Sequence, residues 1–541
     1  MSSIAEQLAG AEPQEPRPLG GLVDRLRAEG WLTGVREGGR AVGAAAVAGI
    51  AIGGVTHDSR RVVPGSLFVA IPGAHVDGHE FALLAARAGA AALLVERPLD
   101  VDVPQLVVGR SQPALATAAC WWYGDPSHEL AVVGITGTDG KTTTSFLAVT
   151  VLEAAGLRTG LVGTAATRIG GLQEDNAEHA TTPDAPALQA ALRAMARAGD
   201  RVAVLETTSH GLALERVGGI AYDVAILTNV THEHLEFHGT WERYRDAKLS
   251  LFERLGPVER AATTAEPHWP ATGIVNLDDP SAGLFVGVAQ EAGARVVTYG
   301  TDPAADVRAT GVEEDATGLR FDYRAPSGPG RLALRLAGRF NVFNALAVVA
   351  LGEAVGLDPP AVRAGLEGVA AVPGRMERID EGQPFGVIVD YAHSPASLEA
   401  VLDGLAPAAA ARGGGLIAVF GSAGERDTAK RPLMGRIAGE RSRVVIVTDE
   451  DPRGEDREAI LDDIARGAEA AGRRRGHDLL VIADRRAALE AAFEVARPAD
   501  IVLLAGKGHE RSIIGPDGPQ PWNEAEVARE LLRAMGPGNT G

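Results

Sequence analysis

The sequence LAVVGITGTDGKTTT, residues 130–144, joins a hydrophobic run to a glycine turn and a Gly-Lys-Thr step. The apolar run Ala131 to Ile135 is typical of a buried parallel strand, and Thr144 to Ala155 has helical character. A glycine turn between strand and helix lets backbone N–H groups approach phosphate oxygens, and the helix N-terminus adds positive partial charge. The layout therefore predicts a phosphate-binding loop in an α/β domain.

Two side chains of this loop would act on a nucleotide. Lys141 would reach the outer phosphates, and the Thr142 hydroxyl would bind Mg²⁺. The spacing departs from the general G-x-x-x-x-G-K-[ST] pattern, because Ile135 stands where the first glycine is expected. An ordinary glycine turn is the alternative, but a Gly-Lys-Thr step after so apolar a strand favours phosphate binding.

The composition is that of a folded globular protein. At about 150 residues per domain, a chain of 541 residues has room for three or four domains. The net charge of −19 argues against a nucleic-acid-binding protein, since such proteins carry basic patches. The single cysteine, Cys120, excludes an intrachain disulfide and fits a reducing compartment. We therefore expect a cytoplasmic protein.

The sequence gives no sign of a targeting or membrane-spanning segment. Residues 1–18 lack the basic start and apolar core of a signal peptide, and we expect them to form a disordered lead. The uncharged stretch Ala41 to Thr56 is too short to cross a bilayer, which needs about 20 apolar residues. We therefore expect no membrane insertion.

Strand and helix patterns divide the remaining chain into three regions, residues 19–128, 129–372 and 373–541. The fold class they predict is α/β. In the third region strands and helices alternate, which predicts a second doubly wound α/β domain. Its strands are expected at Gly386–Asp390, Leu416–Gly421, Arg443–Thr448, Leu479–Ala483 and Asp500–Ala505.

The end of the second region has a different pattern. Residues 306–336 alternate polar and apolar side chains between turn signals, which predicts two or three antiparallel strands. A helix is expected after Gly338, and Asn341 is the candidate residue for its N-cap.

Chemically useful side chains follow the buried strands of the second region. Glu206 ends the strand Arg201–Glu206, at the strand end where α/β sheets collect ligands, and it could reach the Mg²⁺ held by Thr142. His234 lies in THEHLEFHG, which lacks the H-E-x-x-H zinc spacing, so we favour it as a ligand of a second magnesium. Lys248 has an apolar flank. It is either a lysine that snorkels to water or a buried, paired or modified one.

Polar loops follow four of the strands in the third region. They are Asp390–His393, Gly421–Asp427, Asp449–Arg453 and Gly506–Glu510. Each could be an ordinary loop. Because the carboxyl ends of parallel strands meet at one edge of a sheet, their shared position predicts a binding edge.

Taken together, these motifs resemble the Mur ligase family, and within it the MurE-type enzymes. The resemblance extends over nearly everything from Val55 to the C-terminus. The motifs that carry it are TGTDGKTTT (136–144), HATTPD (179–184), ETTSHGL (206–212), TNVTHEHLEFHG (228–239), AKLSLF (247–252), the segment from Gly338 to Val348, PGRME (373–377), DYAHSP (390–395), FGSAGERDTAKRPLMG (420–435), TDEDPR (448–453) and AGKGHE (505–510).

The resemblance implies three domains and a reaction. Residues 19–128 would bind a UDP-sugar, residues 129–372 ATP, and the Rossmann-like residues 373–541 an amino acid. ATP would phosphorylate the γ-carboxylate of D-Glu in UDP-MurNAc-L-Ala-D-Glu. The amine of a diamino acid would then attack the acyl phosphate, which extends a peptidoglycan precursor. The implied partners are small molecules, and we expect a monomer.

The resemblance also assigns roles to residues of the second region. Two anions must meet, so cations have to offset their repulsion. The implied catalytic residues are Lys141, Glu206, His234 and Lys248. In the family the lysine that matches Lys248 is carbamylated. With Glu206 and His234 it would hold a second Mg²⁺, while Thr142 and Glu206 hold the first.

Two further sets of residues match substrate contacts of the family. The implied ATP contacts are Gly137, Thr138, Asp139, Gly140, Lys141, Thr142, Thr143, Asn229, Asn341, Asn344, Arg375 and Asp390. The implied UDP-sugar contacts are His57, Ser59, Ala74, His75, Val76, Thr181, Thr182, Thr208 and Arg216. The chain departs from the family's usual Leu, Asn, Ser and Gln at His57, Ala180, Thr208 and Leu214.

The acceptor loops leave the choice of diamino acid open. The implied contacts are Arg426, Glu450, Asp451, Pro452, Arg453, Gly506 and Glu510. Diaminopimelate enzymes resemble D-N-P-R, and this chain has E-D-P-R. Arg453 can pair bidentately with the distal carboxylate of meso-diaminopimelate, which we favour. Asp451 in place of Asn adds negative charge, which favours the ammonium of lysine or ornithine.

Two other functions remain possible on these residues. The chain could be a sibling ligase that acts on a different precursor, or a non-catalytic protein that keeps the nucleotide fold. The presence of Lys141, Glu206, His234 and Lys248 argues against the second.

Overall fold

The computed structural model describes residues 3–73, 76–176, 180–231, 233–256, 269–315 and 318–535. The chain divides into two compact units, which are described separately. The first comprises residues 1–176, 180–298 and 350–357, and the second comprises residues 299–349 and 358–541 together with residues 177–179. Among the helices of the described ranges, none combines the length and the apolar character needed to span a bilayer.

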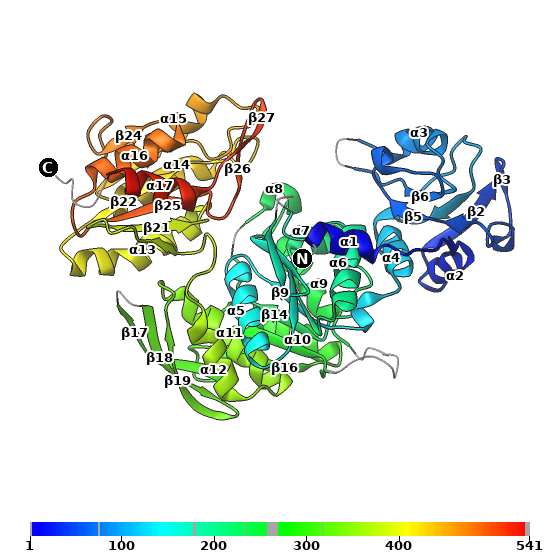
Figure 1. The fold of residues 1–541 in the computed structure, drawn as a ribbon, viewed down its shortest axis with the longest axis horizontal. Coiled ribbons are helices and arrows are strands. Elements are labelled where there is room, and N and C mark those ends of the chain that lie inside the picture. The colour runs from blue at the N-terminus through cyan, green and yellow to red at the C-terminus, as the bar shows by residue number, and fades with distance from the viewer. Residues whose placement is uncertain are drawn as a thin grey trace. The chain divides into compact units, whose positions relative to one another are not determined.

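The N-terminal part of the first unit is a six-stranded sheet with the order β3-β2-β8-β7-β6-β5 (Figure 1). Strands β5 to β8 run parallel, and β2 pairs antiparallel with β8. The strands are β2 (Leu32–Glu37), β3 (Arg40–Ala41), β5 (Gly54–Thr56), β6 (Ser66–Val69), β7 (Ala92–Val95) and β8 (Gln105–Val108), and the main helices are α2 (Gly20–Ala28), α3 (Ala82–Arg87) and α4 (Ser111–Tyr123).

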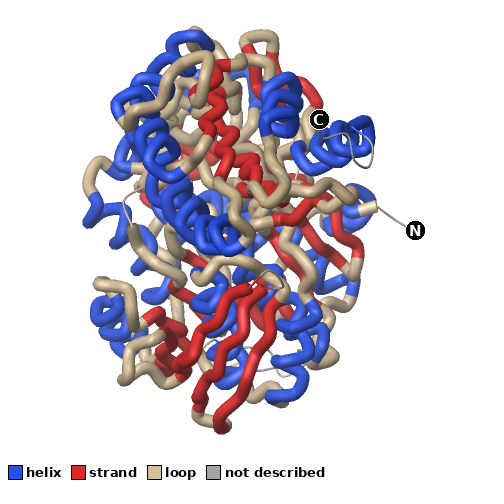
Figure 2. The backbone as a smooth tube through the Cα atoms, turned by 90° about the vertical axis from the view of Figure 1, so that its left-hand side faces the viewer, coloured by secondary structure: helices blue, strands red, loops and turns tan. Residues whose placement is uncertain are grey.

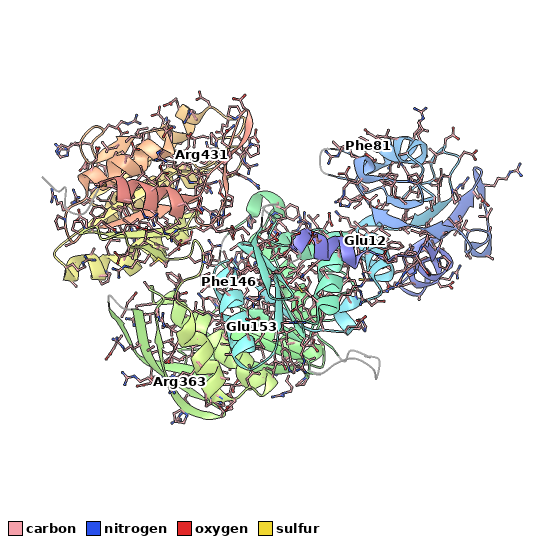
Figure 3. All side chains as sticks on the ribbon, in the orientation of Figure 1. Glu12, Phe81, Phe146, Glu153, Arg363 and Arg431 are labelled. Carbon is pink, nitrogen blue, oxygen red and sulfur yellow. The ribbon has the colours of Figure 1, made fainter. Side chains whose placement is uncertain are left out.

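The expected disordered lead is wrong. Helix α1 (Ile4–Ala11) lies within it, and a capping box between Ser3 and Glu6 satisfies its N-terminus. Ile4 and Ala11 are buried in the hydrophobic cluster of the central sheet. The carboxylate of Glu12 (Figure 3) accepts hydrogen bonds from the Trp122 indole at 3.0 Å and the Tyr123 hydroxyl at 2.5 Å. So short a segment has no core of its own, and tertiary contacts order it.

The central sheet of the first unit contains β12-β11-β10-β13-β9-β14-β15 in this order. Strand β9 lies between β13 and β14, parallel to both, and all its residues are buried. Helix α5 packs against β9, β10 and β13, and α9 packs against β9 (Figure 1). The apolar run that predicted this strand therefore forms the middle of the sheet.

The bounds of these central elements are as follows. The strands are β9 (Ala131–Thr136), β10 (Thr159–Val162), β11 (Ala166–Ile169), β12 (Leu172–Asp175), β13 (Val202–Glu206), β14 (Val224–Leu227) and β15 (Thr272–Asn276). The helices are α5 (Lys141–Ala154), α6 (Ala185–Ala198), α7 (Ser209–Ala213), α8 (Leu235–His238), α9 (Trp241–Glu253) and α10 (Ala282–Glu291).

The second unit begins with the predicted antiparallel strands, β17 (Val307–Asp315), β18 (Gly318–Ala325) and β19 (Gly328–Leu334), which Figure 2 shows side by side. Helices α11 (Phe340–Val355) and α12 (Pro359–Gly368) follow them. Asn341 is not the cap of α11: it lies inside the first turn, where its backbone N–H bonds to the Gly338 carbonyl at 2.8 Å. The predicted cap is wrong because the helix already begins at Phe340, two residues before the start that a cap at Asn341 requires.

The C-terminal part of this unit is the predicted doubly wound domain. Its sheet has the order β20-β21-β25-β22-β23-β24, and only the edge strand β20 is antiparallel. Hydrophobic clusters cover both faces, one with residues of α13, α14 and α15 and one with residues of α16 and α17. The polar loops at the carboxyl ends of the parallel strands therefore share one edge.

The bounds of this domain's elements are as follows. The strands are β20 (Glu377–Ile379), β21 (Gly386–Asp390), β22 (Leu416–Phe420), β23 (Val444–Val447), β24 (Leu479–Val481) and β25 (Ile501–Ala505). The helices are α13 (Pro395–Ala411), α14 (Lys430–Arg441), α15 (Arg457–Ala470), α16 (Arg485–Val495) and α17 (Glu524–Met535).

Candidate active site

The loop between β9 and α5 has the conformation that a phosphate loop needs. Gly140 is the N-cap of α5 and adopts φ +83°. Gly137 adopts φ +152°, and a Cβ on it would lie 1.8 Å from the Thr228 hydroxyl oxygen. Only glycine fits there, so the backbone amides can approach a ligand closely.

Two lysines converge on this loop. The Lys141 ammonium donates to the carbonyls of Gly137 at 3.0 Å and Thr138 at 2.6 Å. The Lys248 nitrogen donates to the same Gly137 carbonyl at 2.6 Å. Lys248 is only 1% exposed, so it does not snorkel to water. Burial and the nearby Lys141 hold the pKa of Lys248 well below its usual range.

The carboxylate of Glu206 is surrounded by hydroxyl groups. Its Oε2 accepts from the hydroxyls of Thr142 at 3.0 Å and Thr164 at 2.7 Å. Its Oε1 accepts from the Thr164 backbone N–H at 3.1 Å and the Ser145 hydroxyl at 3.3 Å. The structure thus brings Thr142 to Glu206. Sequence reasoning missed Thr164 and Ser145, which carry no motif of their own.

The oxygen donors of Thr142 and Glu206 suit magnesium. Mg²⁺ prefers oxygen ligands and usually takes only one or two carboxylates from the protein, completing its shell with phosphates and water. No group of three or more His, Cys, Asp or Glu residues that could hold a metal occurs among the described residues. A hydroxyl and a single carboxylate beside a phosphate loop therefore fit a metal that binds together with a nucleotide.

His234 lies on an aromatic cluster at the start of α8. It adopts φ +55°, and its ring centroid is 4.7 Å from that of His210 and 6.3 Å from that of Tyr244. The Tyr244 ring also lies 4.4 Å from the Lys248 nitrogen, and its hydroxyl is 2.9 Å from that of Thr138. Burial, followed by the charge of Glu233, raises the pKa of Tyr244. Tyr244, which sequence reasoning also missed, therefore stays neutral beside His234 and Lys248.

Asn229 supports the phosphate loop from the next strand. Its side chain accepts from the Asp139 N–H at 3.0 Å and donates to the Asp139 carbonyl at 3.1 Å. Its own carbonyl accepts from the Thr138 N–H at 2.8 Å. The structure therefore shows this predicted nucleotide contact bound to the loop backbone. Thr143 is buried in the first turn of α5.

Several predicted sugar contacts form one hydrogen-bonded group. The Thr182 hydroxyl donates to the Glu206 carbonyl at 2.8 Å and lies 3.0 Å from the Thr208 hydroxyl, which caps α7. Arg216 donates to the Thr182 carbonyl at 2.8 Å, and burial lowers the pKa of its guanidinium. The Thr181 hydroxyl is 3.0 Å from that of Thr164. This group therefore adjoins Glu206.

The remaining predicted sugar contacts lie in the N-terminal part. The His57 ring nitrogen is 3.8 Å from a carboxylate oxygen of Asp184, which caps α6. Ser59 begins a short 3₁₀ helix, Ser59–Arg61. Val76 is 52% exposed. Ala74 and His75 lie outside the described residues.

In the second unit, the residues predicted to contact the nucleotide hold their own segments together. The Asn344 amide donates to the Asn341 side chain at 2.9 Å. The Asp390 carboxylate accepts from the backbone N–H groups of Met376 and Ala392, both at 2.8 Å, and burial raises its pKa. The Arg375 guanidinium lies 4.4 Å from the centre of the Tyr391 ring.

A lysine that sequence reasoning missed ties the acceptor loops together. The Lys507 ammonium donates to Asp451 at 2.8 Å and to Glu510 at 2.5 Å, and its side chain is fully buried. Burial opposes the charge, but Glu510 and Asp451 raise the pKa of Lys507 overall. The same Asp451 oxygen accepts from the Ile514 N–H at 2.9 Å. The negative charge expected at Asp451 is therefore paired within the protein.

Two side chains beside this cluster carry polar atoms without partners. Glu450 is 6% exposed, and its Oε2 has no hydrogen-bond partner among the described residues. The same holds for the buried Nε of Arg453, which follows Pro452 and adopts φ +55°. A Cβ on Gly506 would lie 3.2 Å from that Glu450 oxygen. Buried polar atoms are usually satisfied, so these two point to a ligand. Arg426 is exposed.

The fold and this site define a P-loop-containing α/β protein with a second, doubly wound domain. Three family models match it: "Mur ligase family, catalytic domain" at residues 51–120, "Mur ligase middle domain" at 135–352 and "Mur ligase, glutamate ligase domain" at 374–508. The chain belongs to the Mur ligase family and has its three-domain architecture. The predicted boundaries at 128/129 and 372/373 fall between elements and remain a prediction.

Individual relatives match this chain over most of their length. A UDP-N-acetylmuramyl-tripeptide synthetase of Roseiflexus sp. (strain RS-1) is 50% identical over 492 residues, 90% of this chain and 96% of the relative. A UDP-N-acetylmuramoyl-L-alanyl-D-glutamate–2,6-diaminopimelate ligase of Bacillus velezensis is 42% identical, over 88% of this chain and 93% of the relative. A solved structure with the same activity name is 31% identical and superposes with a TM-score of 0.61, over 90% of this chain and 95% of that one.

Proposed function

We propose that this protein is an ATP-dependent ligase that adds a diamino acid to the D-Glu γ-carboxylate of UDP-MurNAc-L-Ala-D-Glu. The observation that carries the proposal is the convergence of Lys141 and Lys248 on one carbonyl of a phosphate loop. The relatives named above, of which the chain covers more than nine-tenths, support the substrate assignment.

The chemistry proceeds in two steps that suit these residues. A γ-carboxylate oxygen of the dipeptide attacks the γ-phosphorus of ATP, and the bond to ADP breaks, which gives an acyl phosphate. The neutral amine of the diamino acid then attacks the acyl carbon. Phosphate leaves, the nitrogen loses a proton and an amide remains. Lys141 would offset the negative charge that gathers in the first step.

Two magnesium ions would be held by side chains around the phosphate loop. Thr142 and Glu206 would hold one, and Glu206, His234 and a modified Lys248 the other. Magnesium would supply positive charge against the phosphate oxygens. Lys248 suits modification because its amine is buried and its lowered pKa favours the neutral form. A neutral amine reacts with CO₂ to give a carbamate and a proton, which turns the side chain into an oxygen ligand.

For the acceptor we favour meso-diaminopimelate, with lysine or ornithine as the alternative. Lys507 already pairs with Asp451, so Asp451 is not the carboxylate that would bind the ammonium of the acceptor. Glu450 would bind it instead, because its Oε2 has no hydrogen-bond partner among the described residues. Diaminopimelate would offer an ammonium to Glu450 and a carboxylate to Arg453. Lysine or ornithine would offer only the ammonium.

An acceptor panel tests the proposal. Purified protein is mixed with ATP, Mg²⁺ and UDP-MurNAc-L-Ala-D-Glu, and ADP release is measured with diaminopimelate, lysine, ornithine or no acceptor. We expect release that depends on both dipeptide and acceptor, fastest with diaminopimelate. Release with lysine or ornithine alone would overturn the acceptor choice. No release with any diamino acid would overturn the ligase.

A further inference from the structure

A fully buried ion pair lies beneath the acceptor loops. Arg485, the first residue of α16, and Glu524, the first residue of α17, both have side chains that are 0% exposed. The Arg485 Nε donates to Glu524 at 2.9 Å, and one of its terminal nitrogens donates to the other carboxylate oxygen at 2.7 Å. The Trp522 indole also donates to Glu524, at 2.6 Å.

The other donors of Arg485 bind the two acceptor loops. One terminal nitrogen donates to the Asp449 carbonyl at 2.8 Å, and the other to the Ala505 carbonyl at 2.7 Å. Asp449 directly precedes Glu450, and Ala505 directly precedes Gly506. Strands β23 and β25, which lead into these loops, are not neighbours, because β22 lies between them. One guanidinium therefore joins two loops across an intervening strand.

The arrangement is better explained by geometry than by stability. A buried ion pair is a weak source of stability, because the cost of removing two charges from water offsets their attraction. What arginine adds is a rigid, planar set of donors that reaches several acceptors at once. Lysine could not replace it, since a single ammonium cannot keep the fork that bonds both carbonyls and the carboxylate.

We propose that Arg485, held by Glu524, is a positioning residue that sets the spacing of the two acceptor loops and thereby the affinity for the diamino acid. The proposal rests on the proposed function, in which these loops bind the acceptor. Arg485 acts through Asp449 and Ala505 rather than on the substrate. Lys507 holds the outer parts of the same loops, through Asp451 and Glu510.

The test is the double variant R485M/E524Q. It removes both charges, and glutamine still offers the Trp522 indole an acceptor oxygen. We expect the KM for the diamino acid to rise roughly 10- to 100-fold, because small displacements of positioning groups are costly. The KM values for ATP and for the UDP-linked dipeptide should stay within about twofold of the wild-type values. The reason is that the Arg485–Glu524 pair touches neither the phosphate loop nor the predicted sugar contacts Thr182, Thr208 and Arg216.

A matched control lies on the same two helices. Arg486 and Glu530 form an exposed ion pair at 2.8 Å, and R486M/E530Q makes the same chemical change there. We expect its acceptor KM to equal that of the wild type. An unchanged acceptor KM in folded R485M/E524Q would overturn the proposal. If that variant does not fold, R485K replaces it, and a wild-type acceptor KM in R485K would overturn the proposal equally.

Amide hydrogen exchange separates this proposal from the proposed function. If the wild type releases no ADP with any diamino acid, the ligase assignment fails, but the loops can still be followed. We expect the amides of Glu450–Arg453 and Gly506–Glu510 to exchange faster in R485M/E524Q than in R486M/E530Q. Equal exchange rates in the two variants would show that Arg485 does not hold these two loops in place.

Discussion

The phosphate loop and the acceptor loops are both placed at the ends of parallel strands, but they are built in opposite ways. At the phosphate loop, the Lys141 and Lys248 nitrogens meet at one carbonyl, that of Gly137. At the acceptor loops, the cations Lys507 and Arg485 are each buried against carboxylates. The first arrangement leaves the positive charge of Lys141 for an anionic ligand, while the low pKa of Lys248 favours its neutral form. The second arrangement neutralises charge inside the protein.

The difference matches what each region is proposed to bind. A triphosphate is the same strongly charged group in every turnover, so glycine geometry and the Lys141 ammonium can bind it together with the magnesium ions proposed above. A diamino acid must be distinguished from similar molecules. This requires binding side chains that are fixed in place and few charged groups that lack a partner within the protein. Internal pairs such as Lys507 with Asp451 hold the loops and leave the partly unpaired Glu450 for the ligand.

The largest effect is expected at Lys141, and its absence would contradict the comparison between the two regions. K141M should lower kcat for ADP release on the order of 10³-fold, because charge stabilisation at the transferred phosphoryl group is lost. The measurement is kcat with all three substrates saturating, alongside the thermal unfolding midpoint. A folded K141M with more than a tenth of wild-type kcat would contradict the role of this lysine.

Lys248 should come next. K248A should lower kcat roughly 100-fold, because a buried group that faces the loop is removed. Short carboxylates such as formate or acetate should restore part of the rate if a carbamate is the acting group. The control is K141M, which the same acids should not rescue. Full activity of K248A without added acid would refute any part for Lys248 in the reaction.

The buried amine of Lys248 also predicts a pH dependence of stability. Its folded-state pKa lies below the unfolded value, so between the two values the unfolded state binds more protons. Stability should therefore rise with pH in that window, by at most about 1.4 kcal/mol per pH unit for this group. The measurement is denaturant unfolding in CO₂-free buffer from pH 7 to pH 10, for wild type and K248M. The difference between the two free energies of unfolding should change with this sign, and a flat difference would contradict it.

The smallest effects should separate Glu450 from Asp451. E450Q should raise the acceptor KM at least about tenfold, because a hydrogen bond to a charged group is worth roughly 1.5–3 kcal/mol. D451N should raise it less than E450Q does, because the amide oxygen of the new Asn can still accept from the Lys507 ammonium and the Ile514 N–H. A larger effect of D451N than of E450Q would reverse our view of which carboxylate meets the ligand.

Much of the fold followed from local patterns. The strand predicted at Ala131–Ile135 forms as Ala131–Thr136, and the helix predicted from Thr144 begins at Lys141, because apolar runs and glycine turns act within a few residues. The antiparallel strands of residues 307–334 followed from their alternation. Helix α1 did not, because Ile4 and Ala11 are buried only against residues far along the chain. The cap assigned to Asn341 failed because α11 begins at Phe340, and helix boundaries shift easily by one or two residues.

The sequence by itself determined the family, the α/β fold and the phosphate loop, since these depend on short motifs in a fixed order. Only the tertiary structure decided which charges are paired. It buried Lys248 against Gly137, surrounded Glu206 with the hydroxyls of Thr142, Thr164 and Ser145, and joined Lys507 to Asp451. The physical reason is that the state of a charged side chain depends on its neighbours in space and its access to water, and neither is written in the adjacent residues.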